Sequence, residues 1–236
     1  MCGRFALTTS AGELLLEFGL SKAYEVTPRF NIGPSQPVVA VRVPDEAARG
    51  RAGSRELSTL RWGLVPSWAS DPTIGNRMIN ARAETAAEKP AFRKAFLRRR
   101  CLVPMSAFYE WRRGGPRGAE PWAFFRADRA PFAVAGLWER WAGLDGTELE
   151  TCALLTTTPN DLVARVHDRM PVIVARDAYE RWLDPDAKGA VLTGLLVPFP
   201  AHEMDAHRVS PRVGNVANDD AGLLEPLPDD GELELA

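Results

Sequence analysis

Short apolar runs of strand type, separated by Pro, Gly and charged residues, recur along most of this chain of 236 residues. Helical patterns are few and short, and they do not alternate with the strands in the rhythm of a parallel sheet. The pattern therefore predicts an α+β fold, with a mixed, largely antiparallel sheet that curls toward a barrel and short helices that flank it. The expected strands are 37–43, 57–63, 101–105, 122–126, 132–138 and 150–157.

The other segments divide into expected helices and loops. Capping residues and apolar residues spaced by one helical turn predict helices at 6–20, 85–98, 160–166 and 178–183. Residues 28–37 are rich in Pro and Gly, and residues 44–56 are charged, so both are predicted to be loops. We expect one domain over residues 2–225, followed by an acidic, flexible tail at 226–236.

Composition excludes several classes of protein. A net charge of −2 gives no global basic character, so any nucleic-acid binding must come from a local patch. No apolar run reaches the ~18–20 residues that span a membrane, and Met1 is not followed by a secretory pattern. Cys2, Cys101 and Cys152 are far apart, and no histidine lies at zinc-binding spacing from them. We therefore expect a cytoplasmic protein with reduced thiols and no metal.

The N-terminal pentapeptide, residues 1–5, carries a possible nucleophile. Met1 precedes a small residue and is therefore a substrate for removal, which would leave Cys2 with a free α-amine and a thiol on adjacent carbons. Both groups titrate near ~8, so each is partly in its reactive form at neutral pH. Such an aminothiol attacks an aldehyde by forming an imine, which the thiol then closes into a thiazolidine. Most proteins with Cys at this position do not use it, so the pentapeptide alone decides nothing.

Several polar residues lie in apolar or aromatic surroundings. Glu110, between Tyr109 and Trp111, is either a solvent-facing edge residue or a carboxyl whose pKa burial raises toward general acid–base use. His167 is a helix-end cap, a satisfied core residue or a proton shuttle near pH 7. For both residues the structural interpretation is the commoner one, and local sequence alone does not establish the catalytic one.

A second group of polar and aromatic residues could meet a nucleic acid. Asn80 and Arg82 lie two positions apart, so in a strand they point the same way and could hold a backbone and a phosphate, or cap the next helix. Trp68 lies in a Pro-containing loop, where an exposed indole can stack on an unpaired base.

The order of the motifs resolves these alternatives. The chain contains, in sequence, MCGRF, RFNIGPSQ, RWGLVPSWA, MINARAET, KPAFR, RRRCLVP, FYEW, AGLWERW, HDRMPVI and VSPRVGNV. In this it closely resembles the SRAP family, the SOS-response-associated peptidase proteins, from residue 2 to about 225. It departs from the family's pattern at Gly33, where Ala is common, and at Ser106-Ala107, where an Asp/Gly pair is frequent.

The resemblance implies a role for each matching residue. Cys2 would capture abasic sites in single-stranded DNA covalently, as a thiazolidine, and Asn80 would orient the N-terminus. Glu110 would handle protons at the amine and the sugar, and His167 would aid opening of the sugar ring and reversal. Arg4, Arg82 and Arg169 would meet DNA phosphates, while Pro34 and Trp68 lie on loops that would wedge or stack near the lesion.

The implied function is that of a DNA–protein crosslinking enzyme that shields abasic sites from strand cleavage during the DNA damage response. The expected partner is single-stranded DNA, with no cofactor, no metal and no membrane, and the protein is expected to be a monomer that associates with the nucleoid during damage. One alternative is a cysteine peptidase with an N-terminal nucleophile, in which Cys2, Glu110, His167 and Asn80 form an acyl-enzyme. Another is a non-catalytic reader of modified bases.

Overall fold

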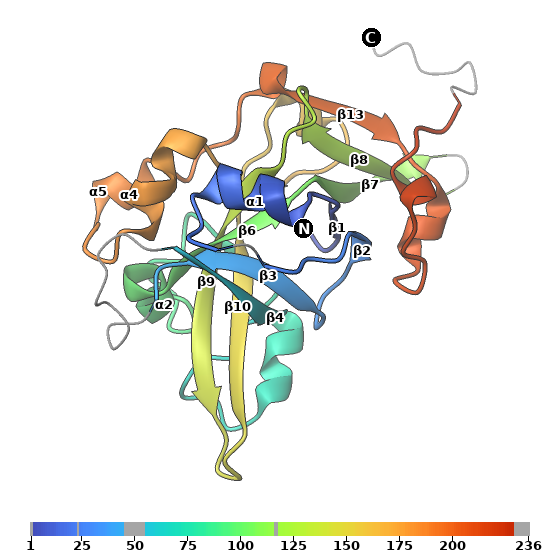
Figure 1. Ribbon diagram of the computed structural model, residues 1–236. Coiled ribbons are helices and arrows are strands. Elements are labelled where there is room, and N and C mark those ends of the chain that lie inside the picture. The colour runs from blue at the N-terminus through green and yellow to red at the C-terminus, as the bar shows by residue number, and fades with distance from the viewer. Residues whose placement is uncertain (1, 23, 45–54, 116–117, 229–236) are drawn as a thin grey trace.

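Two β-sheets form the framework of the protein, as the computed structural model shows for residues 2–22, 24–44, 55–115 and 118–228 (Figure 1). Five strands of the larger sheet close into a ring in the order β10-β4-β3-β6-β9, because β9 pairs with β10 again. The α+β fold with a largely antiparallel, barrel-like sheet is thereby confirmed. The ring strands are β3 (Pro37–Arg42), β4 (Glu56–Trp62), β6 (Arg100–Met105), β9 (Phe132–Ala142) and β10 (Glu148–Thr157).

Three short strands extend the larger sheet, and a second sheet of five strands lies beside the N-terminus (Figure 1). The order in the second sheet is β13-β8-β7-β1-β2. The short strands are β5 (Asn80–Arg82), β11 (Met170–Pro171) and β12 (Ile173–Val174). The strands of the second sheet are β1 (Phe5–Leu7), β2 (Arg29–Ile32), β7 (Ala107–Gly115), β8 (Gly118–Arg126) and β13 (Met204–Arg208).

The helices are short and lie at the periphery of the sheets (Figure 1). No helix in the described parts of the chain is long and apolar enough to cross a membrane. The α-helices are α1 (Ala11–Phe18), α2 (Arg93–Arg98), α3 (Asp161–Ala164), α4 (Tyr179–Leu183) and α5 (Ala190–Thr193). Short 3₁₀ helices occupy Pro72–Arg77, Arg176–Ala178, Ala201–Glu203, Pro211–Gly214 and Ala221–Leu223.

The predicted helix at 6–20 is only partly correct. Residues Phe5–Leu7 form β1, which pairs with β2 and β7, and the helix begins at Ala11. Ser10 and Glu13 form a capping box at its start, and Gly19, with φ of 59°, ends it in the left-handed region. Sheet pairing of an apolar tripeptide thus overrode its helical pattern.

Two further expectations need correction. The predicted loop at 28–37 contains strand β2, and the predicted helix at 85–98 is confined to Arg93–Arg98. Pro90 accounts for the shortened helix because proline lacks the amide hydrogen and clashes with the preceding turn. Most of the predicted loop at 44–56 lies outside the described residues, because 45–54 are not described. The end of the predicted tail, at 229–236, lies outside them as well.

Strand pairing gathers distant segments around the N-terminus. Phe5 of β1 lies opposite Phe108 of β7, so the chain start runs beside the strand that carries Glu110. Strand β5 pairs with β10 in parallel, with Asn80 opposite Leu154, and β11 pairs with the end of β10. The topology therefore places Cys2 beside the strand that carries Glu110, and joins the strand of Asn80 through β10 to β11, which follows His167.

Candidate active site

Cys2 is fully buried at the entrance to β1. The amide of Tyr109 donates a 2.9 Å hydrogen bond to the carbonyl of Arg4, which extends the β1–β7 pairing toward the chain start. Burial, and next the negative charge of Glu110, hold the pKa of the Cys2 thiol well above its usual range. The sulfur is therefore a neutral thiol at physiological pH, and it needs a proton acceptor before or during any attack.

Asn80 contacts the backbone of Cys2 directly. Its side-chain nitrogen donates a 2.8 Å hydrogen bond to the Cys2 carbonyl. Its side-chain oxygen is buried and has no hydrogen-bond partner among the described residues. Since Asn80 belongs to β5, which is fixed on β10, the contact anchors the N-terminal segment to the barrel.

Glu110 is 2% exposed, so the interpretation as a solvent-facing edge residue is wrong. Burial raises its pKa to about 7. A carboxyl that titrates near neutral pH can both accept and return a proton. This is the property that the sequence predicted for a catalytic Glu110.

His167 lies 3.8 Å from Glu110, measured from Nε2 to Oε2. Its position follows from α3, which Asn160 caps by accepting the Val163 amide at 2.9 Å. The Arg169 amide nitrogen lies 3.0 Å from Nδ1 of His167, and the Asp168 carboxylate and the Arg169 carbonyl lie 3.1 and 3.2 Å from the same atom, so these contacts fit either tautomer of the ring. Burial lowers the pKa of His167, which favours the neutral ring. Nε2 of the imidazole faces the Glu110 carboxyl.

The residues predicted to bind DNA differ in their surroundings. Trp68 is 62% exposed in the turn after β4, and Arg82 at the end of β5 is exposed and makes no ion pair with another described residue. Pro34 is half-buried in the turn between β2 and β3. Arg169 is already engaged: it forms a bidentate ion pair with Glu84, with nitrogen–oxygen distances of 2.7 and 2.9 Å. A phosphate would have to compete with that carboxylate.

Arg4 is also held by protein groups. Its guanidinium donates to the side-chain oxygen of Asn31 at 2.8 Å and to the carbonyl of Val213 at 2.6 Å. It also lies 5.9 Å from the ring centre of Trp111. Burial lowers the pKa of Arg4. These contacts tie the residue next to the Cys2–Gly3 pair to the C-terminal segment of the chain.

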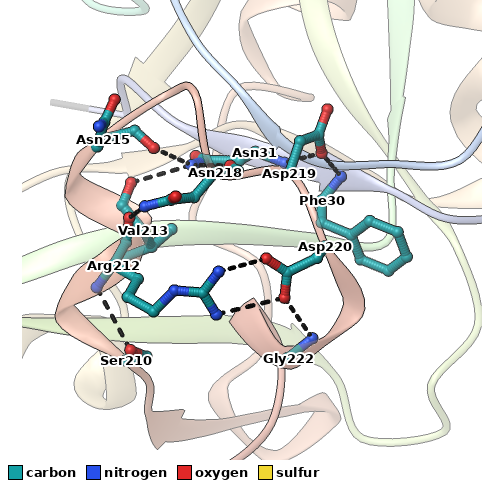
Figure 2. A network of polar contacts seen from close by, with 10 residues as sticks. All are labelled: Phe30, Asn31, Ser210, Arg212, Val213, Asn215, Asn218, Asp219, Asp220 and Gly222. Carbon is teal, nitrogen blue, oxygen red and sulfur yellow. Dashed lines mark hydrogen bonds and ion pairs between the residues drawn. The ribbon is translucent and has the colours of Figure 1, made fainter.

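Asn31 is a buried polar residue that the sequence analysis did not single out. It is fully buried, and its side-chain nitrogen donates to the carbonyls of Val213, Asn215 and Asn218, as Figure 2 shows. Asp219 accepts from the amides of Phe30 and Asn31 along the outer edge of β2. An Asn between two apolar residues, Phe30 and Ile32, was the available indication, but its partners lie far away in sequence.

The chain belongs to the family described as SOS response associated peptidase (SRAP), whose model matches residues 1–216. It is 40% identical over 229 residues to abasic site processing protein YoaM of Bacillus subtilis (strain 168), covering 95% of this chain and 98% of that protein. It is 28% identical to abasic site processing protein YedK of Escherichia coli (strain K12), covering 96% and 100%. A solved structure of a Bacteroides thetaiotaomicron protein matches with a TM-score of 0.84 and 26% identity, covering 96% of this chain and all of that one. The resemblance to the family is thereby confirmed.

Proposed function

We propose that this protein processes abasic sites by capturing them covalently, in single-stranded DNA, through the α-amine and thiol of Cys2. The observation that carries the proposal is the convergence of Asn80 and the Glu110–His167 pair on the N-terminal segment. The names of the relatives, which are abasic site processing proteins, support the choice of substrate.

The reaction begins with the sugar of the abasic site. Its closed ring exposes no aldehyde, so a proton must leave the C1′ hydroxyl and another must reach the ring oxygen. Glu110, with a pKa near 7, and the imidazole of His167, whose Nε2 faces Glu110, suit these two transfers. The Cys2 amine then adds to the C1′ aldehyde, and loss of one water leaves an imine.

The thiol completes the adduct. The Cys2 sulfur adds to the imine carbon, the S–H proton moves to the imine nitrogen, and a five-membered thiazolidine forms without oxidation or reduction. Because the thiol is neutral, the Glu110 carboxylate is suited to carry this proton from sulfur to nitrogen. Ring closure removes the imine, which would otherwise invite β-elimination and breakage of the strand.

A covalent capture experiment tests the proposal. Purified protein is mixed with a labelled single-stranded oligonucleotide that contains one abasic site, then analysed on a denaturing gel and by intact mass. We expect a heat-stable adduct whose mass is that of the protein lacking Met1 plus the oligonucleotide minus one water. An oligonucleotide with a tetrahydrofuran site, which cannot open to an aldehyde, is the matched control. Crosslinking by protein that retains Met1 would show that the aminothiol is not the nucleophile.

The peptidase alternative fits the site less well. An acyl-enzyme mechanism needs a thiolate activated by a nearby base. Here burial and the charge of Glu110 raise the pKa of the Cys2 thiol, which favours the neutral form. Incubation with a generic peptide, beside the abasic oligonucleotide, separates the two activities.

A further inference from the structure

A small cavity lies between α3 and the face of the second sheet that carries Glu110. Its volume is about 130 Å³. At about 30 Å³ per water molecule this is room for about four waters, less than the ~300–1,000 Å³ of a pocket for a whole small-molecule ligand. Its walls are formed by Arg112 and Trp122, Phe124, Asp205 and Ala206 from the sheet, and by Leu162, Arg165 and Val166 from α3 and the turn after it. It therefore suits one planar group rather than a complete ligand.

The register of the sheet places this cavity next to the proposed reaction centre. Trp122 of β8 lies directly opposite Glu110 of β7, so both side chains project from the same face. On the opposite wall, Val166 immediately precedes His167. The cavity is thus lined by the cross-strand partner of Glu110 and by the residue that precedes His167.

The walls combine an aromatic ring with polar groups. The indole nitrogen of Trp122 is buried and has no hydrogen-bond partner among the described residues. The guanidinium of Arg112 lies 5.8 Å from the centre of the Trp122 ring, and Glu120 fixes it through a 2.6 Å ion pair. Asp205, which is exposed, adds a carboxylate. Nucleobases present a flat π-face together with edge donors and acceptors, which match this set.

Arginine side chains at or beside the cavity carry positive charge, which is complementary to the phosphate backbone of the nucleotide that would supply the base. Arg165 is exposed and makes no ion pair within the described part of the chain. Arg208 of β13 lies opposite Trp122 on the same face of the sheet. Aromatic rings combined with Arg and Lys along a groove are the usual arrangement for single-stranded nucleic acid.

We propose that this cavity holds the nucleobase of a nucleotide that directly neighbours the abasic site, against Trp122 and with Arg165 toward the phosphate. The proposal rests on the proposed function, because it places the neighbouring nucleotide relative to the sugar at Glu110 and His167. Binding of this base would hold the lesion strand in register with Cys2, so the neighbour would raise the efficiency of capture.

The test removes one base at a time from the substrate. Single-turnover crosslinking is measured with oligonucleotides in which the nucleotide 5′ or 3′ of the abasic site is replaced by an inert tetrahydrofuran residue. We expect the second-order rate constant to fall for replacement on one side and to change little on the other. A fall of about 5- to 150-fold corresponds to the ~1–3 kcal/mol by which one base stacks on an aromatic ring.

Variants then assign this effect to the cavity. Trp122→Leu should lower the rate constant with the natural neighbour and have little effect when that base is already missing, whereas Trp122→Phe should retain most of the rate. Arg165→Gln is compared with Arg181→Gln, a change of another exposed Arg outside this cavity. The melting temperature of each variant is recorded. A purely structural role for Trp122 would slow capture of both substrates equally, and this would overturn the proposal.

A minimal substrate separates the failure of this inference from failure of the proposed function. 2-Deoxyribose 5-phosphate has the reactive aldehyde but no neighbouring nucleotide, and its adduct is detected by intact mass. If Cys2 captures this sugar and every oligonucleotide at rates independent of the neighbour, the cavity does not hold a base, although aminothiol capture stands. If Cys2 captures neither substrate, aminothiol capture itself is wrong.

Discussion

Asn80 and Cys2 are 78 positions apart in sequence, yet the side-chain amide of Asn80 donates a 2.8 Å hydrogen bond to the Cys2 carbonyl. Most of the N-terminal segment is positioned by strand pairing, which fixes the backbone but not the direction of the terminal residue. Asn80 lies on β5, which is paired with β10 of the barrel, and its hydrogen bond fixes the direction of the Cys2 backbone. The orientation of the proposed nucleophile therefore depends on Asn80, which positions Cys2 and takes no part in the proposed proton transfers or bond formation.

Asn80→Ala should slow crosslinking with little change in DNA affinity. Removing the donor leaves the Cys2 carbonyl without its partner, at a cost of about 1–3 kcal/mol, or about 5- to 150-fold in rate if the full cost falls on the reactive geometry. Single-turnover crosslinking with excess protein measures the rate. Asn76→Ala, at an exposed Asn in the Pro72–Arg77 turn, is the control. Equal rates for the two variants would remove Asn80 from the site.

Glu110→Gln should slow crosslinking by about 10²–10⁴-fold while leaving DNA affinity nearly unchanged, because the amide keeps the shape but cannot carry a proton. The wild-type rate should rise with pH as Glu110 ionises around pH 7, and the variant should lose this dependence. The measurement is the single-turnover rate from pH 5.5 to 8.5. A variant that retains the wild-type rate and pH profile would contradict a proton-transfer role.

The same substitution should change stability in a pH-dependent way. The pKa of Glu110 rises from the ordinary 4.5 to about 7 in the folded protein, so the folded state retains a proton that the unfolded state has lost between these values. The contribution of the Glu110 carboxyl to the free energy of unfolding is fully present below about pH 4.5, and it is lost as pH rises through 7. Glu110→Gln should therefore be the more stable form above pH 7, by up to about 3 kcal/mol, and lose this advantage near pH 4.5. Denaturant unfolding at pH 4.5 and 8 checks this.

The sequence predicted most of the barrel because its strands are continuous apolar runs, which can be recognised from a few adjacent residues. It missed β2, whose outer amides are satisfied by Asp219, nearly 190 positions away. The same reason hid Asn31, whose partners lie in the C-terminal segment. Glu110 could be suspected from its aromatic neighbours, but its burial, and with it the raised pKa, became evident only in the folded sheet.

His167→Ala should slow both formation and release of the crosslink. Nε2 of the imidazole faces Glu110, where it is suited to give a proton to the ring oxygen of the sugar on opening and to take it back on closure. Because one transition state serves both directions, the two rates should fall by comparable factors. Formation is followed by gel, and release is followed by transfer of the protein to a second, differently labelled abasic oligonucleotide. A fall in only one of the two rates would place His167 outside the ring-opening step.

Arg82→Ala should weaken binding of single-stranded DNA and flatten the dependence of log K on log salt by about 0.7 to 1 unit, the contribution of one phosphate contact. Arg82 is exposed and makes no ion pair with a described residue, so its loss should leave the melting temperature unchanged. Arg169→Ala is the informative comparison. It removes the ion pair with Glu84 and the hydrogen bond to the Thr156 carbonyl, so it should lower the melting temperature. Fluorescence anisotropy at several salt concentrations gives the slopes, and an unchanged slope for Arg82→Ala contradicts the phosphate contact.

Cys2→Ala isolates the thiol from the amine. Alanine is also small, so Met1 should still be removed and the α-amine retained. The variant should then form an imine with the abasic aldehyde, which borohydride can trap, but no heat-stable adduct without reductant. Since the imine stays open, β-elimination has time to occur, and the variant should cleave abasic strands more than the wild type does. Cys101→Ala and Cys152→Ala, at thiols buried in the barrel, are the matched controls and should crosslink normally. A stable adduct of Cys2→Ala without borohydride would rule out the thiazolidine and point to another nucleophile.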